Sequence, residues 1–489
     1  MAEAASVPFS ETKAPESPDR LHRGALSLVD IAASTMANIG PAYSFFFSFG
    51  LIVVTSGIAA PLTIIAAGIA IALLGNTLSE FSRAQPSTGG FITFIGKSFG
   101  GTSAVTTALL CGAGYIIAIS SVLAVSGWYL GYVLTYYFHW NVPWIIFSVV
   151  LTGGSVVMMY RGVAVSTKLA GLFFGFEMLV LVIVSIAAMV KNGSYLSAAP
   201  FEWSHLNKGF SGLAPGFPLA VYLFIGWENS AALAEETGNP RRNVPRAVYL
   251  SIAAMGVLYL LVAYSTVVGF HNNAGALSVP LIPFITVAHS TLAKVAVIAY
   301  LAGLTSTVGV LIAAVNSQAR LVFNAGREGL LPRWIGKVHP TRKTPINAIY
   351  AFVGLAGGII AVWCIGHLIG GAHQSGGMSG LNFFDESGTM GTLLILVVYF
   401  GSNLALPFYY RKYRPQEFNV IRHLVLPVIG MVVIAVPVYY LCKPPQPQPY
   451  DWFPYAALII LVFSVIYAFV LNQRDPGLGE RVGSIVADE

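Results

Sequence analysis

Charged side chains are scarce in this sequence. Asp, Glu, Lys and Arg make up 9% of its 489 residues, whereas about a quarter of the residues of a soluble domain are charged. Hydrophobic residues make up 56%, and the mean hydropathy is +0.73. This composition excludes a soluble domain and indicates an integral membrane protein. The apolar runs are long and continuous rather than alternating, which favours membrane helices over a β-barrel.

Several signatures of other protein classes are also missing. Cys111, Cys364 and Cys442 show neither a pairing pattern nor metal-ligand spacing, so we expect no disulfide framework and no metal site. No Gly-x-x-x-x-Gly-Lys-Ser/Thr loop occurs, so ATP drive is not expected. The net charge of +6 is not gathered in one basic module, which argues against nucleic acid as a partner. Residues 1–24 lack the apolar stretch of a secretory signal, and we expect a cytoplasmic tail there.

Twelve apolar runs predict twelve transmembrane helices. With the N-terminus placed inside, 22 Lys and Arg residues fall on the cytoplasmic side and 4 on the outside, as the positive-inside rule requires. We therefore expect a multi-pass protein of the plasma (cell inner) membrane with both termini in the cytoplasm. Residues 366–389 are expected to be a passive extracellular connection. The expected spans are 26–55, 60–78, 105–136, 142–160, 169–190, 213–234, 248–270, 282–315, 346–365, 391–410, 424–441 and 452–471.

Two of these runs contain residues that interrupt a helix. The first holds Asn-Ile-Gly-Pro at 38–41, where Pro41 lacks an amide donor and Gly40 permits unusual dihedral angles. The sixth holds Pro-Gly-Phe-Pro at 215–218 and carries Gly226 at mid-membrane. Taken singly, these residues indicate a packing kink and a close helix contact. Their matching positions five helices apart favour two broken helices that line a cavity, which is the pattern of an inverted-repeat secondary transporter.

Three separated stretches carry motifs of one transporter group. Residues 224–246 contain Phe-Ile-Gly-Trp-Glu-Asn-Ser-Ala, then Ala-Glu-Glu, then Asn-Pro-Arg-Arg-Asn-Val-Pro-Arg. Residues 80–100 contain Glu-Phe-Ser-Arg and Pro-Ser-Thr-Gly-Gly-Phe, and residues 317–345 form an arginine-rich connection. In this order, and on the expected cytoplasmic side, they resemble the amino acid–polyamine–organocation (APC) permease superfamily over about residues 26–415.

The resemblance implies an all-α fold like that of the leucine transporter. Two inverted repeats of five helices, with helices 1 and 6 broken, would be followed by two extra helices. Broken helices of this kind hold the charged groups of a substrate, with amides facing a carboxylate and carbonyls facing an ammonium. The implied parts are a tail (1–24), a transport core (25–415, with repeats at about 25–191 and 210–415), helices 11 and 12 (416–473) and a second cytoplasmic tail (474–489).

The backbone ligands that the resemblance implies lie at the two breaks. They are Ala37, Asn38, Ile39, Gly40, Phe224, Ile225 and Gly226. Many members of the superfamily have a Gly-Ser-Gly run at the first break. Residues 37–43 instead read Ala-Asn-Ile-Gly-Pro-Ala-Tyr, which leaves a substrate without a carboxylate open as an alternative.

Two carboxylates lie deep in the apolar runs, where a charge costs ~2.5–3.5 kcal/mol on insertion. By the resemblance, Glu177 stands where many proton- or sodium-independent members place a lysine. We expect it to recruit a cation or take up a proton; the alternative is a neutral glutamate bonded across helices. Thr305, Ser306 and Thr307 would complete a cation site, or simply join helices. Glu228 matches an acidic residue that an exchanger of this superfamily uses in acid-dependent transport, and its alternative role is to cap the broken helix.

Aromatic residues near the breaks are candidates for a lid over the substrate. They are Tyr43, Tyr115, Tyr222 and Trp227, with Trp227 preferred because it follows Gly226 directly. Their faces would also attract an ammonium by a cation–π contact. The alternative is ordinary packing or anchoring at the membrane interface.

Together these features predict a secondary active permease for a small amino acid or amine, working by alternating access within membrane lipid. Co-transport of H⁺ is expected, with Na⁺ as the alternative, and no bound cofactor. A substrate exchanger for amino acids or polyamines is the alternative within this class. A channel or an intramembrane enzyme is the alternative outside it, and no polar catalytic cluster indicates an enzyme. The sequence does not set the oligomeric state.

Overall fold

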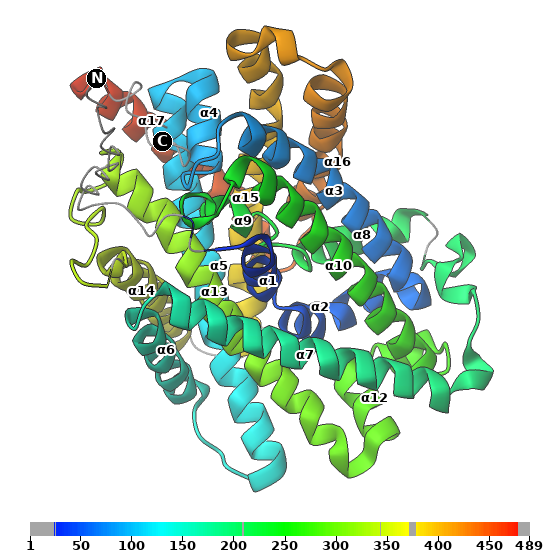
Figure 1. Cartoon of the computed structure of the whole chain (residues 1–489). Helices are drawn as coiled ribbons and strands as arrows, with labels where there is room; N and C mark the ends of the chain where they lie inside the picture. Colours follow the sequence, from blue (N-terminus) through cyan, green and yellow to red (C-terminus); the bar gives the residue numbers. More distant parts are fainter. Residues whose placement is uncertain (1–23, 25, 208–209, 343, 371–377, 478–489) are drawn as a thin grey trace, which may run out of the picture.

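The computed structural model describes residues 24, 26–207, 210–342, 344–370 and 378–477. Over these residues the regular structure is helical, apart from one bridge between Leu26 and Thr237 (Figure 1). Nine stretches of the described chain are long and apolar enough to cross a membrane, and a shorter apolar helix covers Trp144–Tyr160. The expected multi-pass α-helical membrane protein is thereby confirmed.

The helices vary widely in length. The longer ones are α3 (Ala60–Ala84), α5 (Gly101–Phe138), α6 (Trp144–Tyr160), α7 (Val163–Lys191), α10 (Pro240–Gly269), α13 (Val297–Arg327), α14 (Ile346–Gly370), α15 (Gly380–Tyr413), α16 (Leu426–Cys442) and α17 (Phe453–Arg474). The shorter ones are α1 (Leu28–Ile39), α2 (Pro41–Ser56), α4 (Phe91–Phe99), α8 (Phe210–Tyr222), α9 (Asn229–Ala232), α11 (Ala274–Leu277) and α12 (Pro283–Leu292).

The first apolar run is interrupted at Gly40. The Gly40 amide donates to the Met36 carbonyl at 3.0 Å and closes α1, while the Ser44 amide donates to the Gly40 carbonyl at 2.8 Å and opens α2. Gly40 has a φ of 61°, in the left-handed region where a side chain is unfavourable. Pro41 follows as the first residue of α2, a position that does not need an amide donor. Local chemistry therefore accounts for the break.

The sixth run is interrupted as well. α8 ends at Tyr222, residues 223–228 form consecutive turns, and α9 begins at Asn229. Gly226 lies within these turns with a φ of 105°, again a conformation that favours glycine. Both of the helix interruptions expected from the sequence are present.

The eighth run, expected over 282–315, corresponds to one candidate span, Pro283–Arg327, which is divided into α12 and α13 at Ala293, a residue with a positive φ of 50°. The expectation for the connection before the tenth run is wrong. The connection expected over 366–389 is mostly helical in its described part, since α14 reaches Gly370 and α15 begins at Gly380. Phe383 and Phe384 are buried there. Tertiary packing overrides the weak helix propensity of this glycine-rich stretch.

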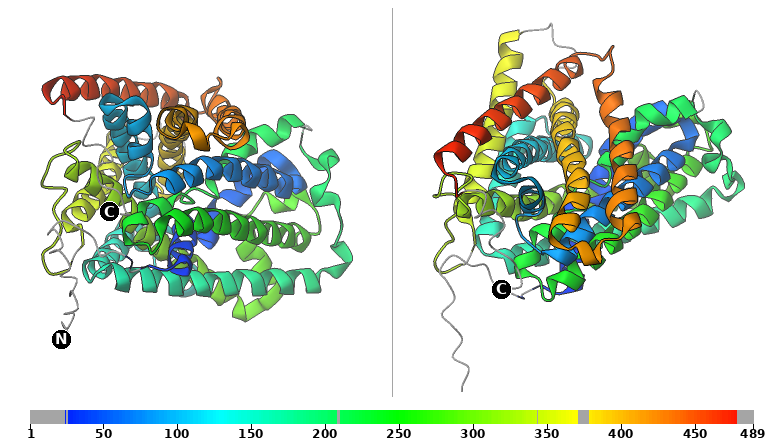
Figure 2. Two further views of the ribbon diagram at one scale, coloured as in Figure 1. Left: turned by 45° about the horizontal axis from the view of Figure 1, so that its top comes forward. Right: turned by 90° about the horizontal axis from the view of Figure 1, so that it is seen from above.

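The broken helices lie at the centre of the bundle. α1 contacts α7, α10 and α13, and Figure 1 shows α1 and α9 enclosed by the longer helices. α5 and α15 pack closely where two glycines face each other. A Cβ added to Gly391 would lie only 2.9 Å from the Gly114 carbonyl oxygen. α16 and α17 lie at the outer flank of the bundle, where α16 contacts α3, α8 and α15, and α17 contacts α5 (Figure 2). The interior is thus built around the two breaks.

Candidate functional site

The two breaks touch each other through Asn38. Its side-chain Nδ2 donates to the Gly226 carbonyl at 3.1 Å, and both groups are buried. A Cβ on Gly226 would lie 2.7 Å from this same nitrogen. Glycine is therefore needed at this position both for its dihedral angles and for the close approach of α1.

Side chains from two other helices cap the start of α2. The Ala42 amide donates to the Glu177 carboxylate at 3.0 Å, and the Tyr43 amide donates to the Ser306 hydroxyl at 2.9 Å. Glu177 is on α7 and Ser306 on α13, and both are buried. A carboxylate at a helix N-terminus is stabilised by the helix dipole. The amides expected to face a substrate carboxylate are thus paired with protein groups in this conformation.

The end of α1 keeps carbonyl groups without their usual helical donors. The carbonyl of Ala37 would bond the amide of residue 41, but Pro41 has none. The carbonyl of Asn38 would bond the Ala42 amide, which donates to Glu177 instead. Buried carbonyls of this kind attract a hydrogen-bond donor such as an ammonium group.

Glu228 caps the second break. One of its oxygens accepts the Gly226 amide at 3.2 Å, and the other accepts the Tyr115 hydroxyl at 2.9 Å. Glu228, Tyr115 and Asn38 line a small cavity of about 20 Å³ together with the uncharged side chain of Gln318. Each break therefore has one buried carboxylate bonded to a backbone amide, Glu177 at the first break and Glu228 at the second.

A central chamber lies between the breaks. Its volume is about 40 Å³, which is room for a few water molecules at most. No Asp, Glu, Lys or Arg occurs among the described residues that line it. They are Asn38, Ile39, Tyr43, Ser44, Ala118, Ile119, Val122, Tyr222, Ile225, Gly226, Val310, Ala314, Gln318, Thr392 and Ile395.

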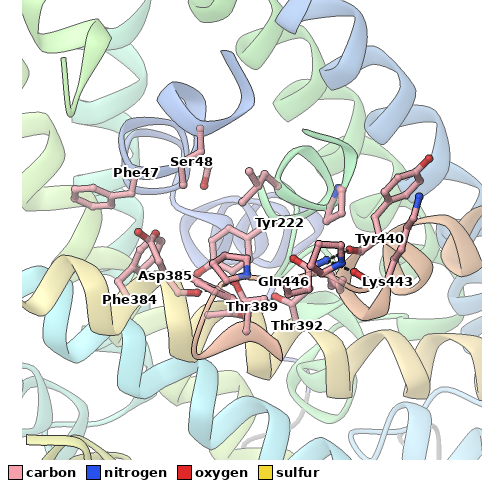
Figure 3. A pocket seen from close by; sticks show the side chains of 18 of the residues that line it. Phe47, Ser48, Tyr222, Phe384, Asp385, Thr389, Thr392, Tyr440, Lys443 and Gln446 are labelled. Atoms are coloured by element: carbon pink, nitrogen blue, oxygen red, sulfur yellow. Dashed lines mark hydrogen bonds between the residues drawn. The ribbon is translucent and has the colours of Figure 1, made fainter. Parts of the chain in front are cut away.

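A tyrosine pair separates the central chamber from a larger cavity. The hydroxyls of Tyr43 and Tyr222 lie 3.1 Å apart, and both rings meet Phe384 edge-on at centroid distances of 5.6 and 5.8 Å. Beyond this pair lies the vestibule, a cavity of about 510 Å³ bordered by Phe47, Tyr222, Asp385, Lys443 and neighbouring residues (Figure 3). Tyr222 and Thr392 line both cavities.

Not every candidate residue joins the site. The hydroxyls of Thr305 and Thr307 bond carbonyls of their own helix, so of the three α13 candidates only Ser306 reaches the break. Phe224 packs against Tyr259 at 5.3 Å. Trp227 packs against Tyr399 at 5.6 Å and does not line the central chamber. Of these aromatic candidates, Tyr43 and Tyr222 line the central chamber, whereas the Trp227 side chain after the turn at Gly226 is directed away from it.

Two buried ion pairs follow α9 on the side expected to be cytoplasmic. Arg320 donates through Nε to Glu236 at 2.7 Å and through a second nitrogen at 3.3 Å, and Arg327 donates to Glu235 at 3.0 Å. Both arginines are on α13. In the sequence these four residues are only parts of the family motifs. Two arginines about two helical turns apart, just beyond an apolar run, are the only local signal of these ion pairs. The signal does not identify the carboxylate partners, which lie some 90 positions away in the chain.

Replacing Arg320 with methionine is expected to destabilise the protein by about 3–5 kcal/mol, because it strands the buried carboxylate of Glu236. The double variant Arg320→Met, Glu236→Gln should recover much of this loss. Glu417→Gln is the matched control, since this carboxylate is exposed and its pair with Arg414 is worth about 1 kcal/mol or less. Thermal unfolding in detergent measures all three. Equal losses for Arg320→Met and Glu417→Gln would contradict a buried, paired Glu236.

A third polar cluster joins α3 to the start of α16. Glu80 lies 3.4 Å from Arg83 and also accepts from His423 Nε2 at 3.1 Å. The Asn419 amide donates to His423 Nδ1 at 2.9 Å, so the imidazole proton is at Nε2. The ring stacks on Tyr410 at 3.6 Å. The sequence contained no local signal for this contact.

The fold and site define a multi-pass helical membrane protein in which two interrupted helices meet at a buried, uncharged chamber. The chain belongs to the amino acid permease family, whose model matches residues 26–481. It is 24% identical over 322 residues to the branched-chain amino acid permease BcaP of Bacillus subtilis, covering 61% of this chain and 66% of that protein.

Two further relatives show the range of this similarity. The mouse Asc-type amino acid transporter 1 is 26% identical over 296 residues, covering 58% of this chain and 54% of that protein. The methylthioribose transporter of Bacillus subtilis is 24% identical over 353 residues, covering 65% of this chain and 73% of that protein. The matches therefore span about half to three quarters of these relatives.

Proposed function

We propose that this protein is a secondary active permease that carries a neutral amino acid across the plasma membrane by alternating access. The observation that carries the proposal is the contact between the two helix breaks, where Asn38 bonds the Gly226 carbonyl beside the central chamber. Irregular backbone at membrane depth is tolerated only where it is buried in protein or lines a cavity. Here it leaves the carbonyls of Ala37 and Asn38 as ligands for an ammonium group.

The chamber lining supports a neutral substrate with an apolar side chain. A lysine or arginine substrate would bring a second positive charge next to uncharged walls, which is costly in a desolvated site. Ile39, Ile119 and Val310 are suited instead to an aliphatic side chain. The names of BcaP and of the mouse transporter, which refer to amino acids, agree with this choice.

Glu177 supplies the coupling in this proposal. Its carboxylate holds the Ala42 amide, and Ser306 holds the neighbouring Tyr43 amide. A proton taken up by Glu177 removes the charge that favours this cap, and the N-terminus of α2 becomes free to hold the substrate carboxylate. Proton and amino acid then bind together. A sodium ion bound by Glu177 and Ser306 is the alternative coupling ion.

Alternating access requires a closure on each side of the chamber. The Tyr43–Tyr222 pair forms the outer closure, and the ion pairs of Arg320 and Arg327 form the inner one. The chamber of about 40 Å³ is smaller than an amino acid, so it widens when substrate binds. The full architecture proposed is twelve spans in two inverted five-helix repeats plus two helices, with both termini cytoplasmic.

Uptake of radiolabelled L-leucine into proteoliposomes tests the proposal. An inward proton gradient is expected to drive saturable accumulation of L-leucine, and a protonophore should abolish it. Unlabelled L-isoleucine should inhibit the uptake, whereas L-lysine should not. Accumulation that requires a sodium gradient identifies the alternative ion. Uptake that requires amino acid inside the vesicles identifies an exchanger. Flux that does not saturate, or the absence of uptake for every neutral amino acid, would overturn the proposal.

A further inference from the structure

The vestibule contains a charge arrangement that the central chamber lacks. Asp385 of α15 and Lys443, just after α16, both line it, and Figure 3 shows them in separate parts of the cavity. Phe47, Leu51, Leu219, Tyr440 and other apolar or aromatic side chains form most of the remaining wall. A cavity of about 510 Å³ with few polar groups falls within the range of small-molecule sites.

The Asp385 carboxylate has no partner within the described chain. No hydrogen bond or ion pair of its side chain occurs there, although the side chain is partly buried. Asp385 is beyond the first turn of α15, so the helix dipole does not account for it. Its neighbour Glu386 is different, because it accepts the indole hydrogen of Trp363 at 2.7 Å and does not line the vestibule.

Asp385 lies next to the outer closure. Phe384, the preceding residue, contacts the rings of both Tyr43 and Tyr222, and Asp385 lines the same cavity as Tyr222. A cationic group bound by Asp385 therefore lies directly outside the tyrosine pair. Lys443, in another part of the cavity, repels a cation, so the ammonium group of a solute in the vestibule is favoured at Asp385.

We propose that the vestibule is a second binding site, in which one zwitterionic amino acid waits with its ammonium group on Asp385 before the Tyr43–Tyr222 pair opens. The inference rests on the proposed function, since it takes the transported amino acid as the occupant. The site raises the local concentration of substrate beside the closed chamber and selects solutes that carry a free amino group. 4-Methylpentanoate, which has the leucine carbon chain without the amine, is not held there.

Equilibrium binding of radiolabelled L-leucine to the purified full-length protein in nanodiscs tests the inference. Two leucines per wild-type protein are expected, with one in Asp385→Asn and two in the matched control Glu386→Gln. Gly226→Ala, in which the new Cβ crowds Asn38, should lose the central leucine and keep the one in the vestibule. Unlabelled 4-methylpentanoate should not displace the leucine that Gly226→Ala retains.

The outcomes separate this inference from the proposed function. Equal stoichiometry in wild type and Asp385→Asn overturns the vestibule site while leaving a permease with one central site. Loss of all binding in Gly226→Ala, with the protein still folded by thermal unfolding, also overturns it. No L-leucine binding or uptake by the wild-type protein overturns both the inference and the proposed substrate.

Discussion

Proteoliposomes containing Glu177→Gln are expected to equilibrate L-leucine but not to accumulate it against a gradient. A gradient of about one pH unit supplies about 1.4 kcal/mol, enough for up to about tenfold accumulation with one proton per substrate. Glutamine is neutral like the protonated carboxyl of Glu177, so the variant stands permanently in the state in which the Ala42 amide is released from the charged cap. It cannot take up a proton, so the gradient no longer does work on the substrate. Accumulation ratios at imposed pH and sodium gradients measure the effect.

Two controls accompany this variant. Glu417→Gln changes an exposed carboxylate paired with Arg414 and is expected to accumulate substrate like the wild type. Exchange of labelled for unlabelled leucine without a gradient shows whether Glu177→Gln still moves substrate. If Glu177→Gln accumulates leucine as the wild type does, Glu177 is a neutral cap of α2 and coupling lies elsewhere.

Gly40→Ala is expected to abolish transport and lower stability. An alanine in the left-handed conformation of Gly40 costs about 1–2 kcal/mol. Its Cβ would also come within 1.9 Å of Val310 Cγ2, and overpacking of this kind costs about 1–3 kcal/mol. The strain falls on the residue that joins α1 to α2. It therefore displaces both the backbone carbonyls proposed to bind the substrate and the capped amides at the start of α2. Thermal unfolding and leucine exchange measure the two effects.

A second substitution separates the two causes. Val310→Ala removes the clashing methyl group. The double variant Gly40→Ala, Val310→Ala should therefore recover the stability lost to the steric clash, while the loss caused by the left-handed alanine remains. Gly153→Ala on α6 is the control, because a Cβ there meets nothing within 4 Å. A Gly40→Ala protein with wild-type stability and exchange would show that the break does not depend on this conformation.

The Glu177 cap shows where sequence reasoning stops. A carboxylate in an apolar run is identified from the sequence alone, because its burial is costly enough to require a reason. Its partner, the Ala42 amide, lies 135 positions away and is chosen by how α7 packs against the start of α2. The same holds for Ser306, which local sequence could not separate from Thr305 and Thr307. Of the three hydroxyls, the rotation of α13 directs only this one toward the break.

The aromatic candidates make the same point. Tyr43 and Tyr222 approach each other from α2 and α8, whereas Trp227, closest in sequence to Gly226, points toward Tyr399. A turn with a positive φ changes the direction of the chain, so proximity to the break in sequence does not set proximity to the chamber. The glycine-rich surroundings of Asp385 predict a loop, whereas the residue lies in the second turn of α15.

The sequence by itself determined the membrane class, the family motifs and the two helix breaks. Each of these depends on local chemistry: apolar length, the missing amide of Pro41, and the dihedral freedom of Gly40 and Gly226. Only the tertiary structure decided which groups cap the breaks, which rings close the chamber and which charges face the vestibule. These contacts join residues far apart in the chain, and the rotation and depth of each helix are set by packing against all of its neighbours.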